Sequence, residues 1–240
     1  MLRAALRTVL FILLSHTLQA CGTASKATPY VSLSEEQEAR KALDAKDFER
    51  AIELYKALIE AEPETYARYP FLATAYAGQA GFDIFETLVE SVVTSQGSHL
   101  SPVDVIKSAL PADPNDLQLQ AMASARDTIL AIPADLRSKT NAEASYASSA
   151  ALQLEFYQAA YPLMYMNRFV AKTSSGSLDP DRLASMTPED AAAILDSLRS
   201  AEGLGGDLGT AVSSVLSEID AQPGADTKEK LIQYLSTHSS

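Results

Sequence analysis

The feature that most constrains this chain is a helical spacing of apolar residues that begins at Leu33 and continues almost to the last residue. Apolar side chains recur three and four positions apart in nearly every long segment, and Ala, Leu, Glu and Gln dominate these segments. This spacing is typical of amphipathic helices, whereas a half-buried strand alternates apolar and polar residues and is rich in β-branched ones. No convincing run of the second kind occurs, so the sequence predicts an all-α fold.

Capping residues and helix breakers set the expected ends of these helices. Thr187 followed by Pro188 is a start signal, because Thr caps a helix and Pro is tolerated at its first position. Pro63 and Gly203 are stop signals. The expected helices are 33–45, 48–61, 66–80, 82–95, 102–109, 114–131, 141–161, 163–172, 188–202, 207–220 and 226–237.

Residues 39–63 carry the most specific pattern of the helical part. Ala51 is small enough for two helices to approach closely, Phe48 and Tyr55 lie on either side of it on one helical face, and Pro63 ends the second helix. This segment resembles a tetratricopeptide repeat. In that family, stacked helix pairs bury a continuous core that no single pair can bury alone.

A second, altered copy follows at the family's 34-residue period. It places Phe82, Phe85 and Val89 where Phe48, Ala51 and Tyr55 stood, with Gly97 in place of the terminal proline. Since no third copy follows, the resemblance covers roughly 32–97. It implies a tetratricopeptide-like domain at 33–172, which the remaining helices complete. After the loop 173–180, the C-terminal helical segment 173–240 is expected to pack on or cap the array.

The resemblance also implies a partner-binding groove. In the family, the first helix of each pair lines this groove. That rule points to Arg40 and Asp44 from the first pair and to Arg68 and Thr74 from the second.

The N-terminus carries a separate signal. Arg3 and Arg7 precede a short apolar stretch, which ends at Leu18-Gln19-Ala20-Cys21 with the only cysteine of the chain. A basic start, an apolar stretch and small residues at the cleavage point form a secretory signal, and the stretch is well short of the ~20 residues that span a bilayer. The Leu-x-Ala-Cys motif resembles the processing box of bacterial lipoproteins.

This resemblance implies that residues 1–20 are removed and that Cys21 becomes the lipidated first residue. In Gram-negative bacteria an Asp after the cysteine usually retains a lipoprotein in the inner membrane, and this chain has Gly22. The implied location is therefore the outer membrane, facing the periplasm. Residues 21–32 are small and polar and predict a flexible tether.

Charge and composition exclude several classes of function. The net charge of the whole chain is −12, and removing Arg3 and Arg7 with the signal makes the mature chain still more acidic. Nucleic acids and anionic lipids need a basic surface, so neither is an expected ligand. His16, His99 and His238 form no pair, and no Gly-x-Ser-x-Gly motif or phosphate loop with Lys-Ser/Thr is present. We therefore expect no metal, no cofactor and no catalytic residue.

Residues 142–171 are unusually rich in Tyr, Phe and Met and are interrupted by Pro162. One interpretation is a central core helix, broken at this proline, around which the other helices pack. The other is an apolar pocket for a lipid, a peptide or a small ligand, lined by Tyr157, Tyr161 and Tyr165. The sequence does not decide between them.

Two hypotheses of function follow. The first is a non-catalytic, lipid-anchored interaction protein that binds a partner protein in an envelope assembly. Tetratricopeptide lipoproteins commonly serve as assembly factors for outer-membrane, pilus or secretion machines. The second is a helical ligand-binding accessory lipoprotein associated with transport, whose apolar pocket lies around residues 146–169.

Overall fold

The computed structural model describes residues 34–83, 101–141, 144–173 and 178–238. All regular elements within these ranges are helices, apart from an isolated bridge between Lys172 and Leu178, so the fold is all-α as predicted. Cys21, the signal 1–20 and the tether 21–32 lie outside the described residues. So do His99 and nearly all of the expected helix 82–95.

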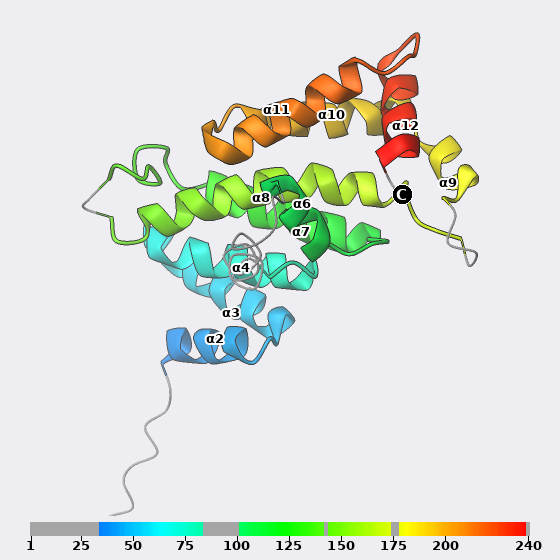
Figure 1. The fold of residues 1–240 in the computed structure, drawn as a ribbon. Coiled ribbons are helices and arrows are strands. Elements are labelled where there is room, and N and C mark those ends of the chain that lie inside the picture. Colours follow the sequence, from blue (N-terminus) through cyan, green and yellow to red (C-terminus); the bar gives the residue numbers. More distant parts are fainter. Residues whose placement is uncertain (1–33, 84–100, 142–143, 174–177, 239–240) are drawn as a thin grey trace, which may run out of the picture. The chain divides into compact units, whose positions relative to one another are not determined.

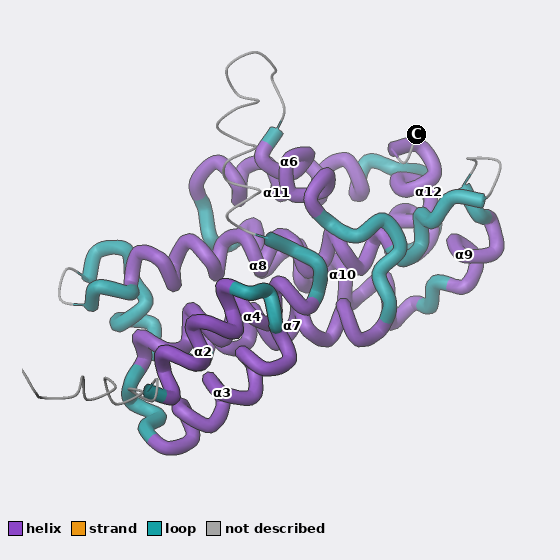
Figure 2. The backbone as a smooth tube through the Cα atoms, turned by 90° about the horizontal axis from the view of Figure 1, so that it is seen from below, coloured by secondary structure: helices purple, strands orange, loops and turns teal. Residues whose placement is uncertain are grey.

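The N-terminal helices of the described part pack around small residues. They are α2 (Glu35–Asp44), α3 (Phe48–Ala61), the 3₁₀ turn η1 (Tyr66–Arg68) and α4 (Tyr69–Gln79). Asp47 caps α3 by accepting a hydrogen bond from the Arg50 amide at 3.3 Å. Figure 2 shows α2, α3 and α4 side by side, and a small hydrophobic cluster lies between them, formed by Ala39, Ala51, Tyr55, Leu58, Leu72 and Ala75.

A larger hydrophobic cluster begins on the other side of α4 and extends to the C-terminus. Its next elements are α6 (Pro102–Ala109), α7 (Asp116–Leu130) and α8 (Ala147–Asn167). Reciprocal side-chain caps fix the starts of α6 and α7, through Ser101 with Asp104 and Asn115 with Gln118. In Figure 1, α8 lies between α4 and α7 on one side and α10 and α11 on the other, and contacts between these elements agree.

The sequence-based expectation for this region was wrong in two respects. First, α8 is one continuous helix with Pro162 inside it, rather than two helices broken there. Pro162 is buried, so packing of α8 on its neighbours offsets the lost backbone hydrogen bond. Second, α8 begins at Ala147 rather than near 141, because Asn141 caps a preceding turn by accepting from the Ala144 amide at 3.2 Å.

The C-terminal elements are α9 (Pro180–Ser185), α10 (Pro188–Glu202), α11 (Gly206–Asp220) and α12 (Thr227–His238). The short helix α9 was not expected from the sequence. Thr187 caps α10 in the expected way, accepting from the Asp190 amide at 3.0 Å. Leu183, Ile194, Val212 and Leu231 all belong to the larger hydrophobic cluster, so the C-terminal helices share one core with α4, α6, α7 and α8.

Candidate functional site

The candidate site is a cavity of about 630 Å³ between α2, the start of α3, α4 and the start of α8. Its walls are largely apolar and include the rings of Phe48, Phe71 and Phe82. Small-molecule sites in proteins are typically concave, mostly apolar and roughly 300–1,000 Å³ in volume, with a few placed polar groups. The cavity matches this description and joins segments about a hundred residues apart in the sequence.

Four of the residues that the sequence analysis assigned to binding sites line this cavity. Arg40, Asp44 and Thr74 come from the repeat-like segment, where they were expected to form a groove. Tyr157, which was expected in an apolar pocket, comes from α8 and is fully buried. The structure thus brings members of the two predicted sites into one cavity.

Arg68, the fourth expected groove residue, does not line the cavity. Its Nη1 donates a hydrogen bond to the carbonyl oxygen of Leu58 at 2.8 Å, and its Nη2 lies 3.0 Å from a carboxylate oxygen of Glu62. The side chain is only 12% exposed. A cation that binds a carbonyl in the last turn of a helix stabilises that end, so Arg68 secures the C-terminal end of α3.

Tyr161 and Tyr165 also lie away from the cavity. The Arg126 guanidinium is 4.8 Å from the centre of the Tyr161 ring, and the Tyr165 hydroxyl donates to Asp190 at 2.5 Å. Burial and this hydrogen bond raise the pKa of Tyr165 to about 12. These two tyrosines therefore connect α8 to α7 and α10, which is a role in the core.

The floor of the cavity holds a short polar network with a fixed direction. The Thr74 hydroxyl donates to the Pro70 carbonyl at 2.9 Å, which uses its only proton. Thr74 Oγ1 must then accept from the Gln153 amide, whose Nε2 lies 3.2 Å away. The Gln153 oxygen Oε1 consequently faces away from Thr74 and is an acceptor with no hydrogen-bond partner.

One buried polar atom at this floor is without a partner. Gln153, 4% exposed, is the one buried polar side chain in the part of the chain that the structure describes. Its Oε1 has no hydrogen-bond partner, whereas the Tyr157 hydroxyl interacts with the Thr74 side chain. Burial raises the pKa of the Tyr157 phenol far above its usual value, so this group stays neutral. An unpaired buried polar group costs roughly 1–3 kcal/mol, and a bound ligand could remove that cost.

Charged side chains surround the mouth of the cavity. The Lys46 ammonium lies 3.4 Å from Asp83 Oδ2, and the Arg40 guanidinium lies 4.4 Å from the centre of the Phe71 ring. Lys46 has a φ of 58°, a left-handed conformation that strains any residue with a Cβ. No pattern in the sequence indicated the left-handed backbone of Lys46, whereas Gln153 could have been noticed as a polar residue in an apolar stretch.

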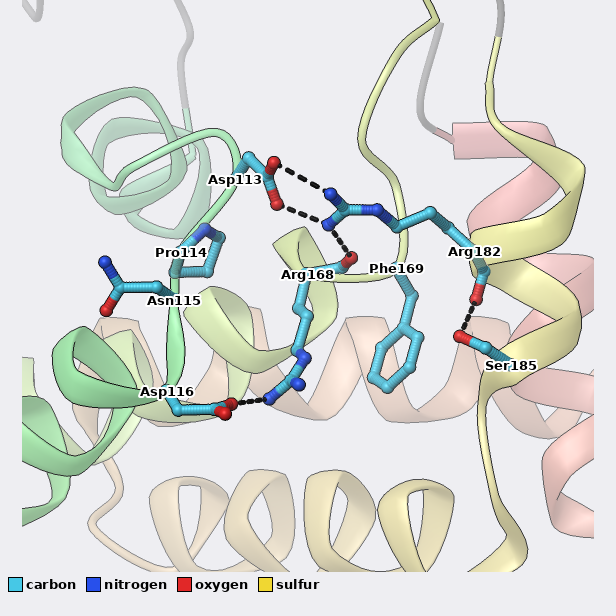
Figure 3. A pocket seen from close by; sticks show the side chains of 8 residues that line it. All are labelled: Asp113, Pro114, Asn115, Asp116, Arg168, Phe169, Arg182 and Ser185. Carbon is cyan, nitrogen blue, oxygen red and sulfur yellow. Dashed lines mark hydrogen bonds and ion pairs between the residues drawn. The ribbon is translucent and has the colours of Figure 1, made fainter.

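A second, polar cavity of about 470 Å³ lies among the α6–α7 loop, the end of α8 and α9 (Figure 3). Arg182 binds both carboxylate oxygens of Asp113, at 2.5 and 3.0 Å, and donates to the Arg168 carbonyl at 3.3 Å. Arg168 in turn pairs with Asp116. Because each guanidinium already has a carboxylate partner, this arrangement joins three segments and leaves no uncompensated charge for a ligand.

No match was found to a family model, to a curated protein or to a solved structure. Within the described ranges, no helix combines the length and the apolar character needed to cross a membrane. The same ranges contain no group of three or more His, Cys, Asp or Glu side chains that could hold a metal ion. The function is therefore argued from the geometry of the cavity.

Proposed function

We propose that this protein is a non-catalytic binding protein of the bacterial cell envelope, held on the membrane by a lipid at Cys21. Its ligand enters the cavity between α2, α4 and α8. The observation that carries this proposal is that Arg40, Asp44, Thr74 and Tyr157 line one cavity that has the unpaired oxygen of Gln153 at its floor. This arrangement favours the ligand-binding hypothesis over a shallow groove for a partner.

The anchor is supported by the N-terminal motif Leu18-Gln19-Ala20-Cys21, and the outer-membrane location by Gly22. Two or more acyl chains hold a protein on a membrane stably, because each buried CH₂ contributes about 0.8 kcal/mol. Replacing Cys21 by Ser should therefore abolish fatty-acid labelling and membrane association. Acyl label that persists on the Cys21→Ser protein would show that the lipoprotein assignment is wrong.

A protein partner is the second candidate occupant of the same cavity. Exposed charged side chains at the mouth, such as Arg40, Asp44 and Lys46, are typical of the polar rim of a protein interface. A partner from an envelope assembly would insert an apolar segment between them. This hypothesis predicts the same contact residues but a much larger occupant.

Binding rather than catalysis is supported by the chemistry of the lining residues. The cavity has no histidine or cysteine in its lining, and the lysine at its mouth lies beside Asp83 rather than beside a hydroxyl nucleophile. A general base must lie within hydrogen-bond reach of a nucleophile or a substrate proton. The floor offers only a neutral amide, a threonine and a phenol.

The proposal is tested by placing a photo-crosslinking amino acid in the full-length protein in cells. Ser149 is exposed on α8 and lines the cavity, whereas Ser200 is exposed on α10 and does not. We expect a specific adduct from position 149 that is absent from position 200. The mass of the adduct distinguishes a small ligand from a protein partner. Equal labelling at the two positions would contradict binding at this cavity.

A further inference from the structure

We infer that the cavity between α2, α4 and α8 accepts an uncharged amphipathic small molecule, which has an apolar body and donates a hydrogen bond to Gln153 Oε1 from an amide, aromatic amine or hydroxyl group. This inference rests on the proposed binding function and specifies the chemistry of the ligand. It is carried by three features of the structure: the direction of the floor network, the placement of charge and the aromatic walls.

The floor network requires a donor from the ligand. The Thr74 hydroxyl donates its only proton to the Pro70 carbonyl, so it can only accept from Gln153. The Gln153 amide nitrogen therefore faces Thr74, and the amide oxygen faces away. That oxygen is buried and unpartnered. Since it can only accept, a group that satisfies it must carry an N–H or O–H.

The placement of charge excludes an ionised group at the floor. The cations Arg40 and Lys46 and the anions Asp44 and Asp83 are residues of the α2 side and of the segment after α4, not of the floor. Lys46 already lies beside Asp83, and Arg40 lies over Phe71. An anion or a cation at the floor would be buried without a counter-charge, which is strongly unfavourable.

The walls favour a flat or extended apolar body. Phe82 packs edge-on against Tyr157, with ring centres 6.3 Å apart, and Phe71 stacks on Tyr55 at 5.7 Å. Phe48 lies so close to the backbone of α4 that a Cβ on Gly78 would overlap its ring. The glycine thus allows this ring to form a wall of the cavity. Aromatic faces of this kind bind apolar groups by area and by ring geometry.

The turn after α2 places an ion pair at the mouth. Lys46 keeps a left-handed backbone at φ 58° because it terminates α2: its amide donates to the Leu43 carbonyl at 3.0 Å, and the next amide, of Asp47, donates to the Ala42 carbonyl at 2.9 Å. The Lys46 ammonium lies 3.4 Å from Asp83 Oδ2. The pair contributes one side of the mouth and leaves its charges compensated there, which suits an uncharged ligand.

The test uses two fluorescent probes that differ in one group. N-phenyl-1-naphthylamine is neutral and has one N–H that joins an apolar naphthalene to a phenyl ring. 8-Anilinonaphthalene-1-sulfonate has the same body, with a sulfonate next to the N–H. If the N–H binds at the floor, the sulfonate must be buried there as well. We expect the mature full-length protein to bind the neutral probe at least tenfold more tightly than the sulfonate.

A matched pair of variants then tests the assigned acceptor. Gln153→Leu should weaken binding of the neutral probe by roughly three- to tenfold, which is the loss of affinity expected for one hydrogen bond. Gln158→Leu is the control, because Gln158 lies on the same helix, also has a buried unpartnered oxygen, and does not line the cavity. It should leave binding unchanged. Both variants are measured in the same detergent solution, which keeps the lipid-anchored protein dissolved.

Each other outcome overturns the inference. Equal or tighter binding of the sulfonate would show that the cavity takes anions. If Gln153→Leu binds the neutral probe as tightly as wild type does, the hydrogen bond to Gln153 Oε1 is wrong. If the neutral probe shows no saturable binding, the cavity does not accept a small molecule of this class. The comparison of the two probes needs no variant, so it stands even if Gln153→Leu fails to fold. A protein-sized adduct at position 149 would overturn this inference while leaving the proposed binding function intact.

Discussion

Replacing Ala51 by Leu tests the packing that holds α2 against the wall of the cavity. Ala51 is fully buried in the small hydrophobic cluster, where Ala39 from α2, Tyr55 from α3 and Ala75 from α4 are also fully buried. It lines none of the cavities described above, so no space exists for the three added carbon atoms. Overpacking of a dense site costs about 1–3 kcal/mol.

The measurement is thermal unfolding of wild type and variant under the same conditions. For a domain of roughly 150–250 residues, 1 kcal/mol lowers the melting temperature by about 2–4 °C. Ala51→Leu should therefore unfold roughly 2–12 °C below wild type. The control is Ala57→Leu, because Ala57 is exposed on the same helix. Its free energy of unfolding should change by no more than about 0.5 kcal/mol.

A melting temperature of Ala51→Leu equal to that of wild type would refute this reasoning. It would mean that α2 and α3 do not meet closely at Ala51 and that residues 39–63 do not pack as a tetratricopeptide pair would. A loss of similar size in Ala57→Leu would instead show that the added bulk acts generally on α3. Only the difference between the two variants measures the packing at the contact.

Lys46→Gly and Lys46→Ala both remove the ion pair at the mouth, but only glycine adopts the φ of 58° without strain. In chemical denaturation the glycine variant should therefore be more stable than the alanine variant by about 1 kcal/mol, and equal stability would contradict the left-handed turn. Arg68→Ala should lower the free energy of unfolding by roughly 1.5–3 kcal/mol in denaturant titrations without changing binding of the neutral probe. Unchanged stability with weakened probe binding would instead show that Arg68 belongs to the binding site. Burial alone would raise the pKa of Asp190, but hydrogen bonds from a phenol on α8 and from the N-cap threonine of α10 outweigh it and lower the pKa. Asp190→Asn should therefore be less stable than wild type at neutral pH, and the difference should shrink as the pH falls through this lowered pKa. Asp196→Asn is the control at an exposed position of the same helix, and it should change stability less at neutral pH.

Local signals in the sequence predicted the helices whose ends they control. The expected range 48–61 agrees with α3, which Asp47 caps, and the expected range 188–202 agrees with α10, which Thr187 caps. The break expected at Pro162 was wrong because a local rule was applied to a residue buried among neighbouring helices. Tertiary packing overrides local preference most readily at such positions.

The candidate site was predictable only in its parts. Arg40, Asp44 and Thr74 followed from the repeat resemblance, and Tyr157 from an aromatic-rich segment, but these were expected to form two separate sites. Their union depends on the contact of α8 with α4, which no local pattern specifies. The role of Gln153 as an unpaired acceptor depends in addition on the direction of the hydrogen bond that Thr74 donates to Pro70. Only the three-dimensional structure shows this direction.

The position of α4 explains why a cavity forms at this point. One side of α4 places Leu72 and Ala75 in the small hydrophobic cluster with α2 and α3, and another places Ala73 and Ala77 in the larger cluster. The cavity lies where the two clusters meet, since its walls include Phe71, packed against the small cluster, and residues of the larger one. An apolar ligand there would join the two clusters across α4. Because a ligand that binds only the folded state stabilises it, occupancy should strengthen the attachment of α2 and α3 to the rest of the fold.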